Sequence, residues 1–170
     1  RSILEIETAE MILKNNLGYS LKYFAYPYGE FDFKLKNRLR AHGYIGFAQH
    51  SGAIASYSDF SALPRYPSAG IYSNIQSLKV KLNSLAMPVD SVSPYDPKVE
   101  LYSDSEILSF SIKTEDLIPQ QINCFQNGQT LSKSLKGNTI SVDITPITQP
   151  GRHRVNCTAP SINKTNRFYW

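Results

Sequence analysis

A short turn carries the residues with the clearest potential for chemistry. Residues 24–31 read FAYPYGEF and join an apolar strand, predicted at residues 21–26, to the start of an amphipathic helix. Pro27 fixes its own φ at about −65° and lacks an N–H donor, while Gly29 permits a backbone conformation closed to residues with a Cβ. Such a strand-turn-helix corner directs backbone N–H groups outward, an arrangement that suits an oxyanion.

Two further segments place polar residues after predicted strands. Residues 43–52 read GYIGFAQHSG, a strand that runs into a polar loop with Gln49 and His50, and residues 62–67 read ALPRYP, a third strand with Arg65 after a proline. His50 is a candidate general acid with Gln49 assisting, because imidazole titrates in the required range. The alternative for His50 is a polar loop histidine without catalytic duty.

The elements that would position these residues alternate between helix and strand. Apolar residues at helical spacing predict helices at residues 3–17, 32–42 and 74–85, and Gly18 and Gly43 mark the ends of the first two. The strands fall between these helices, as in βα units. In a barrel built from such units, the strand ends converge on one face.

The pattern changes after about residue 86. Residues 87–97 read MPVDSVSPYDP and are interpreted as a linker. Short alternating segments follow, with Asn127-Gly128 and Gly137-Asn138 as hairpin turns. They predict an immunoglobulin-like β-sandwich over residues 98–170. Its strands are expected at residues 98–102, 106–113, 120–126, 129–135, 139–144, 152–158 and 167–170.

The two cysteines, Cys124 and Cys157, each lie in a predicted strand. Their strands could face one another across the sandwich, and a disulfide there would close a loop of about thirty residues and stabilise the fold by roughly 3–4 kcal/mol. A disulfide implies an oxidising compartment. The alternative is two buried free thiols.

Composition limits the other classes of function. The 170 residues are enough for one or two domains with real cores. The net charge is only +4, and the basic residues are scattered, which argues against nucleic-acid binding. No apolar run approaches the roughly 18 residues that a membrane span requires.

Residues 3–67 resemble the later part of a polysaccharide deacetylase catalytic domain (carbohydrate esterase family 4, the NodB-homology domain). The turn, the Gly-Tyr strand, the Gln-His-Ser-Gly loop and the Leu-Pro-Arg segment follow one another as in its secreted bacterial branch. The resemblance implies a deformed (β/α) barrel, of which residues 1–86 would be the C-terminal portion. It also implies a periplasmic or extracellular enzyme that removes N-acetyl groups from an N-acetylglucosamine-type polysaccharide.

The metal ligands of that family have no counterpart in this chain. Members bind a divalent metal, expected here to be zinc, through one Asp and two His from motifs upstream of the turn. His42, His50 and His153 lack the spacing of a metal pair. We therefore expect the ligands on a missing N-terminal half of the catalytic domain, and no activity from this chain alone.

The resemblance also assigns roles to individual residues. It places the backbone N–H of Tyr28 in the oxyanion hole, with Pro27 holding the turn and the Tyr28 ring lining the sugar pocket. Tyr26, Pro27 and Gln49 are expected to contact substrate. The alternative for Tyr28 is an ordinary turn with a packed tyrosine.

One position departs from the family pattern. Many members carry Arg where this chain has Ala25, and that Arg orients the catalytic Asp. Arg65 is the candidate for this task, and a surface or structural ion pair is its alternative. For the chain as a whole, the alternative to an enzyme is a non-catalytic carbohydrate-binding or structural module.

Overall fold

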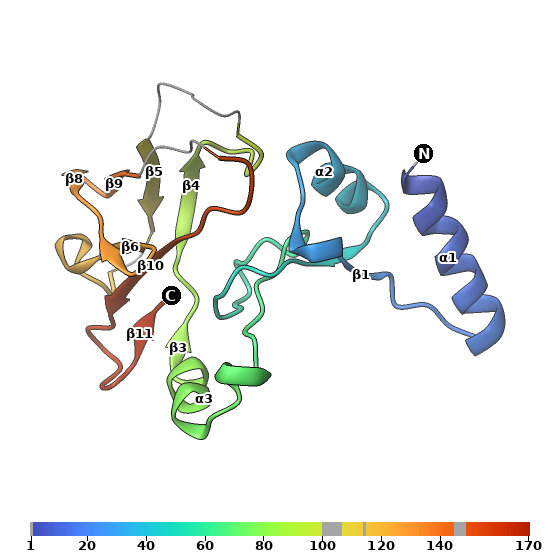
Figure 1. Ribbon diagram of the computed structural model, residues 1–170, viewed down its shortest axis with the longest axis horizontal. Coiled ribbons are helices and arrows are strands. Elements are labelled where there is room, and N and C mark those ends of the chain that lie inside the picture. Colours follow the sequence, from blue (N-terminus) through green and yellow to red (C-terminus); the bar gives the residue numbers. More distant parts are fainter. Residues whose placement is uncertain (1, 100–106, 114, 145–148) are drawn as a thin grey trace.

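The computed structural model describes residues 2–99, 107–113, 115–144 and 149–170. These residues form a mixed structure of helices and sheets in which most strands belong to two C-terminal sheets (Figure 1). They do not form a closed barrel; the N-terminal half contains only a small parallel sheet.

That small sheet supports the residues singled out in the sequence. Strand β1 (Tyr23–Ala25) pairs in parallel with β2 (Ile45–Phe47), and helix α2 (Phe33–Ala41) connects them. A parallel bridge between Phe47 and Leu63 marks a third strand position within the predicted segment 62–67. The expected order of strands and helices is therefore present, with shorter strands than predicted.

Side-chain packing holds α2 against this sheet. The helix begins after Asp32, whose Oδ1 accepts a hydrogen bond from the Leu35 N–H at 2.7 Å and so caps the first turn. Leu39 on the inner face of α2 is fully buried. It belongs to one core cluster with Tyr26, Tyr44, Ala48 and Ala62.

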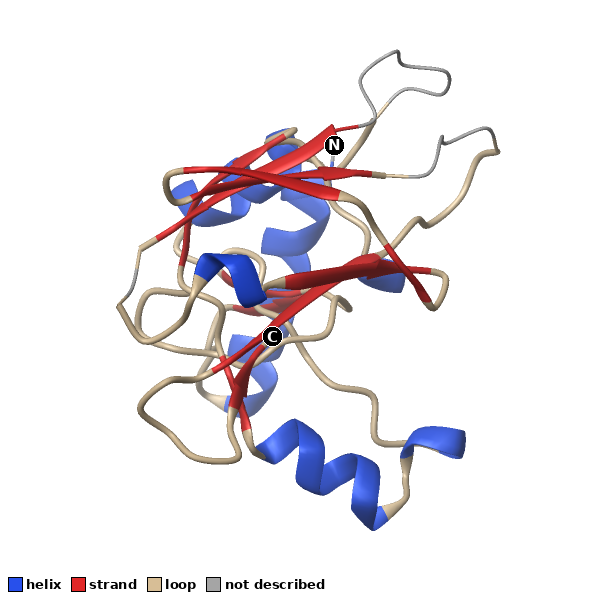
Figure 2. Cartoon of the chain, turned by 90° about the vertical axis from the view of Figure 1, so that its left-hand side faces the viewer, coloured by secondary structure: helices blue, strands red, loops and turns tan. Residues whose placement is uncertain are grey.

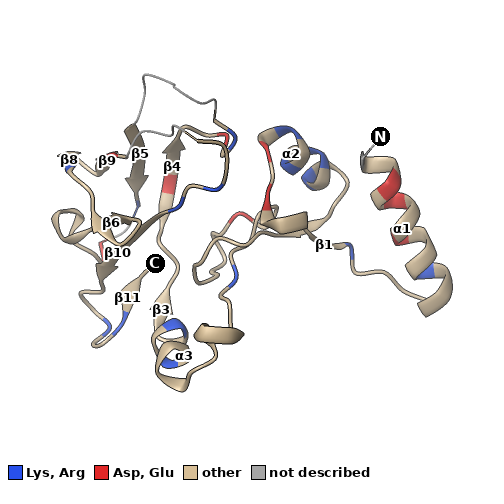
Figure 3. Cartoon of the chain, in the orientation of Figure 1, with Lys and Arg blue, Asp and Glu red and all other residues tan. Residues whose placement is uncertain are grey.

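Helix α1 (Ser2–Leu17) confirms the helix predicted at residues 3–17. It lies at the edge of the molecule (Figure 1) and packs Ile3 and Ile6 against the core of the N-terminal half. His42, the C-cap of α2, approaches Glu7 of α1 with 2.6 Å between Nδ1 and Oε1. Figure 3 marks acidic residues on α1 and basic residues on α2 by colour. Of the helices in the described ranges, none is both long and apolar enough to cross a bilayer.

The C-terminal half contains two sheets that share one hydrophobic core. Their strands run in two layers in Figure 2. One sheet has the order β3-β11-β10-β6-β7 and the other the order β4-β5-β9-β8. The strands are β3 (Ser84–Leu85), β4 (Val89–Ser93), β5 (Ile107–Ile112), β6 (Asn123–Gln126), β7 (Gln129–Thr130), β8 (Lys133–Lys136), β9 (Thr139–Asp143), β10 (Val155–Pro160) and β11 (Phe168–Tyr169).

The segment interpreted as a linker contains a strand, β4. Within residues 87–97, β4 pairs antiparallel with β5, and Ser91 Oγ lies 2.7 Å from Ser111 Oγ. The prolines that suggested a linker, Pro88 and Pro94, flank the strand, where the missing N–H disturbs no ladder. The predicted helix 74–85 is also too long: α3 (Ile75–Leu82) ends earlier, and β3 pairs in parallel with β11.

The hairpin predictions are confirmed. Asn127 and Gly128 both have positive φ, 52° and 79°, as the turn between β6 and β7 requires, and Gly137 has φ 61° between β8 and β9. The strand predicted at residues 98–102 lies mostly outside the described residues.

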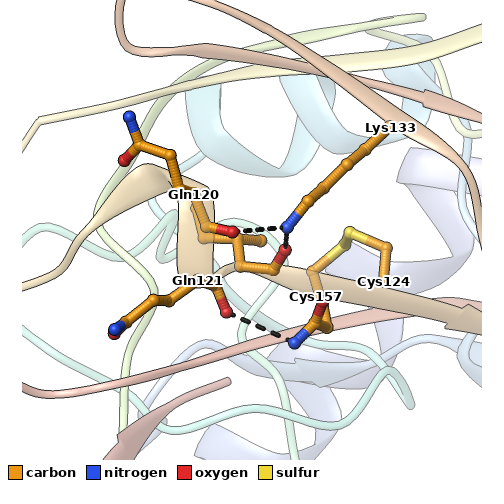
Figure 4. Close-up of a disulfide and its surroundings, with 7 residues drawn as sticks. Gln120, Gln121, Cys124, Lys133 and Cys157 are labelled. Atoms are coloured by element: carbon orange, nitrogen blue, oxygen red, sulfur yellow. Dashed lines mark hydrogen bonds between the residues drawn. A yellow bond between two sulfur atoms is a disulfide. The ribbon is translucent and has the colours of Figure 1, made fainter.

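Cys124 and Cys157 form the predicted disulfide. Its setting differs from the prediction, because the two cysteines do not face one another across two sheets. β6 and β10 are antiparallel neighbours in one sheet, and Cys157 lies directly opposite Cys124 (Figure 4). Beside this cystine, Lys133 Nζ donates to the carbonyl oxygen of Gln120 at 2.8 Å and to that of Ile122.

Candidate functional site

The turn after β1 is a single 3-10 turn, η1 (Pro27–Gly29), with an unusual residue at its centre. Tyr28 has φ 55° and ψ 6°, the left-handed region that a residue with a Cβ seldom occupies. Its side chain is not packed: the residue is 79 % exposed. Among the described residues, no acceptor takes the Tyr28 N–H, so this donor is available to solvent or to a ligand.

Two hydrogen bonds fix the peptide planes on either side of Tyr28. The Pro27 carbonyl accepts from the Glu30 N–H at 3.1 Å, and the Gly29 N–H donates to the Tyr26 carbonyl at 2.8 Å. Because the Tyr28 N–H belongs to the same peptide unit as the Pro27 carbonyl, its direction is set by the first of these bonds. The donor is therefore preorganised.

The ends of the parallel strands bring three of the predicted site residues together. Tyr28 follows β1, Gln49 follows β2, and Arg65 follows the bridge residue Leu63. In one of the two orientations of its amide, the Gln49 side chain joins the other two: its Nε2 donates to the Tyr28 carbonyl at 3.2 Å, and its Oε1 accepts from Arg65 Nη2 at 3.1 Å. The Arg65 N–H also donates to the His50 carbonyl at 3.0 Å.

His50 lies at this edge, but its electrostatics weaken the predicted role as a general acid. Although His50 is an exposed residue, desolvation of its ring lowers the pKa of His50 below 6.5, and the charge of Asp59 opposes this shift. A lowered pKa leaves the imidazole uncharged at neutral pH. The N–H of a neutral imidazole is a much weaker acid than that of an imidazolium, so it is poorly suited to protonate a leaving amine. In the part of the chain that the structure describes, no hydrogen bond orients the ring.

Tyr26 is part of the core, although the sequence suggested a contact with substrate. The residue is 1 % exposed, and its hydroxyl donates to the Ser61 carbonyl at 2.6 Å. Its ring packs against Phe24 and Phe31. Burial, with the nearby Asp59 charge, raises the pKa of Tyr26 to about 12. The Tyr26 ring therefore packs beneath the turn as part of the core and is not accessible to a ligand. Pro27, the next residue, is exposed.

Asp59 forms a group of ion pairs and hydrogen bonds that the sequence did not indicate. Its carboxylate lies 3.1 Å from Lys36 Nζ and 2.8 Å from Arg40 Nη2, both on α2, and accepts from the Ser61 N–H at 3.0 Å. Burial alone would raise its pKa, but the hydrogen bonds from Ser61, Arg40 and Lys36 outweigh it and hold the pKa of Asp59 well below its usual range. Basic residues four apart on α2 were the only signal for this contact.

We expect Asp59→Asn to lower the free energy of unfolding at pH 7 by about 2–3 kcal/mol, less than the loss at a fully buried pair because the Asp59 side chain is 37 % exposed. The main reason is that Lys36, 8 % exposed, would keep its charge without a carboxylate. Urea unfolding at pH 7 measures the loss. The control is Asp90→Asn, an exposed carboxylate on β4, and equal losses in the two variants would contradict the expectation.

The lowered pKa of Asp59 also predicts how the free energy of unfolding changes as the pH falls. A folded-state pKa below the unfolded value, about 3.9, gives stability that is fully present above that value and is lost as the pH falls toward the folded-state pKa. The wild type should therefore lose stability in acid more steeply than Asp59→Asn. Urea unfolding between pH 6 and pH 2.5 checks this, and parallel curves would contradict it.

At the turn itself, the structure adds a second residue that the sequence did not indicate. Arg152 lies in the segment before β10, yet its guanidinium reaches the turn: Nη2 donates to the Tyr28 carbonyl and lies 3.3 Å from Glu30 Oε1. More than a hundred residues separate the partners, and no local pattern marks such a contact.

The divalent metal implied by the resemblance does not fit onto the described residues. Nowhere in the described ranges do three His, Cys, Asp or Glu side chains gather into a group that could hold a metal ion. Comparisons of this chain with protein-family models, curated proteins and solved structures found no match. The site defined by the geometry is thus an exposed turn at the end of parallel strands with one backbone N–H donor that no described residue accepts, and these residues supply no group of metal ligands.

Proposed function

We propose that this chain is the C-terminal part of a secreted, metal-dependent polysaccharide N-deacetylase, which hydrolyses N-acetyl groups to acetate and free amines. One observation carries the proposal: the Tyr28 N–H is fixed by its turn, has no acceptor in the described structure, and lies beside an exposed aromatic ring. An N-acetylated sugar offers the matching groups, a carbonyl oxygen for the amide and a ring face for the tyrosine.

The residues of this chain would act mainly by positioning and by electrostatics. The acetamido oxygen would accept the hydrogen bond from the Tyr28 N–H. This bond strengthens as the carbonyl carbon becomes tetrahedral and the oxygen gains charge, an effect worth about 3–4 kcal/mol for one fixed donor. Arg65, held by Gln49, would orient a catalytic carboxylate supplied from outside these residues. A metal with ligands elsewhere would activate the attacking water.

The architecture is interpreted in the same terms. The small parallel sheet with α1 and α2 would be the C-terminal portion of a deformed (β/α) barrel, completed by a missing N-terminal half. The two C-terminal sheets would form an immunoglobulin-like β-sandwich that serves as an accessory domain. The disulfide supports a periplasmic or extracellular location, because disulfides persist in oxidising compartments.

The decisive experiment extends the chain upstream and measures acetate release from an N-acetylglucosamine oligomer. We expect release that requires both the added segment and a divalent metal, and none from the 170-residue chain alone. Oligomer binding without acetate release from the extended chain would instead favour the non-catalytic carbohydrate-binding module.

A binding experiment tests the site within this chain. Titration of the ¹⁵N-labelled chain with an N-acetylglucosamine oligomer should shift the Tyr28 amide resonance downfield in the proton dimension, because a new hydrogen bond forms at that N–H. Resonances of the Gln49 and Arg65 side chains should shift with it. The fully deacetylated glucosamine oligomer is the matched control, since it lacks the carbonyl acceptor. Equal responses to both oligomers would contradict the site.

A further inference from the structure

We propose that Arg152, a residue of the strand-rich C-terminal half, is a positioning residue that holds the Tyr28 turn in its donor conformation. The catalytic effect that we expect of Arg152 rests on the proposed function. The contacts between Arg152 and the turn do not depend on that function. If Arg152 positions the turn, the C-terminal half contributes a residue to the site in addition to its own fold.

Arg152 reaches three groups of the turn region, the third of them in one of the two orientations of the Gln49 amide. Its Nη2 donates to the Tyr28 carbonyl and lies 3.3 Å from Glu30 Oε1. Its Nη1 lies 3.3 Å from the Gln49 amide, which accepts from it when the amide takes the orientation opposite to the one that serves Arg65. The guanidinium fork suits such a set, because its several N–H groups point in fixed directions.

Arg152 adds an external restraint to the two hydrogen bonds within the turn. Tyr28 occupies left-handed backbone space, which costs energy for a residue with a Cβ and persists only where its surroundings hold it. The hydrogen bond of Glu30 fixes the peptide unit before Tyr28. The unit after Tyr28 donates its Gly29 N–H to the Tyr26 carbonyl and presents its own carbonyl to Arg152. The charge-assisted bond to that oxygen is a second restraint on rotation of the unit.

The geometry also explains why the restraint comes from the other half. The segment before β10 extends from the strand-rich half toward α2 and β1 (Figure 1), and Arg152 is 33 % exposed at this junction. Glu30 is 69 % exposed, so its ion pair contributes little stability by itself. The ion pair with Glu30 instead orients the Arg152 guanidinium toward the Tyr28 carbonyl.

The test compares Arg152→Ala and Arg152→Lys with Arg154→Ala. Arg154 is exposed and makes no hydrogen bond or ion pair within the described residues, so it controls for charge. In the 170-residue chain, Arg152→Ala should shift the Tyr28 and Gly29 amide resonances and speed hydrogen exchange at Glu30 by about tenfold or more. Arg152→Lys should fall between Arg152→Ala and the wild type, because one ammonium cannot reach all three groups.

The second readout is kinetic and uses the extended, acetate-releasing protein. Arg152→Ala should lower kcat by about 10- to 100-fold and leave KM within about threefold, because a misdirected donor loses interactions made in the transition state. Arg154→Ala should leave both constants unchanged. Arg152→Ala with unaltered amide resonances and unaltered kcat would overturn the inference. If the extended wild type releases no acetate, the proposed function fails while the amide resonances still decide whether Arg152 holds the turn.

Discussion

Gly29→Ala is expected to lower the free energy of unfolding by about 2–5 kcal/mol and to abolish the response of the turn to an N-acetylglucosamine oligomer. Gly29 has φ +73°, so any Cβ there meets its own backbone. The Cβ would also lie 2.4 Å from the Gln49 Cβ and 2.7 Å from the Gln49 backbone nitrogen. A rotamer change cannot relieve a clash with the backbone, so the turn must move away from β2.

The chain provides a matched control for this prediction. Gly43 has φ +75°, and no atom lies within 4 Å of the position that a Cβ would take there, so Gly43→Ala carries the backbone cost without the clash. We expect it to lose about 1–2 kcal/mol. Urea unfolding of both variants separates the two effects. A Gly29→Ala chain that fails to fold while Gly43→Ala folds agrees with the expectation, and equal losses in the two variants would refute the close approach to Gln49.

Loss of the cystine is the other large effect that we expect. The Cys124→Ala, Cys157→Ala double variant should be less stable than the oxidised wild type by about 3–4 kcal/mol, because a cross-link over 33 residues restricts the unfolded chain. Cys124 is fully buried within the core of the two sheets, so the folded state also loses packing. The measurement is equilibrium unfolding in urea, with and without reductant.

The unfolded chain supplies a second signature of the cystine. Without the cross-link it expands, so the dependence of the unfolding free energy on urea should become steeper. Reductant should destabilise the wild type to near the level of the double variant and leave the variant itself unchanged. A wild type whose unfolding is insensitive to reductant throughout the transition would contradict the prediction.

Both effects act on regions that support the proposed site in different ways. Gly29 lets the turn approach Gln49, which in turn contacts Arg65. The cystine joins β10 to β6, and Arg152 lies just before β10. We therefore expect the cystine variant, where it remains folded, to show a weaker restraint on the Tyr28 turn as well.

The local elements of this protein follow from its amino-acid sequence alone. Apolar spacing and glycine stops located α1 and α2, and the Asn127-Gly128 pair located a hairpin, because these signals act between residues close in the chain. The sequence also placed Tyr28, Gln49 and Arg65 after successive strands, and parallel pairing then brought them to one edge.

The identity of neighbouring strands and the meeting of distant side chains depend instead on the complete fold. Alternation along a strand identifies its two faces but names no partner, so the cystine was expected between sheets although β6 and β10 lie side by side in one sheet. Burial of Tyr26 and the contacts of Asp59 follow from packing that no local pattern encodes. Arg152 meets Tyr28 across 124 residues of chain, because the fold, and not the spacing of residues, brings the two halves together.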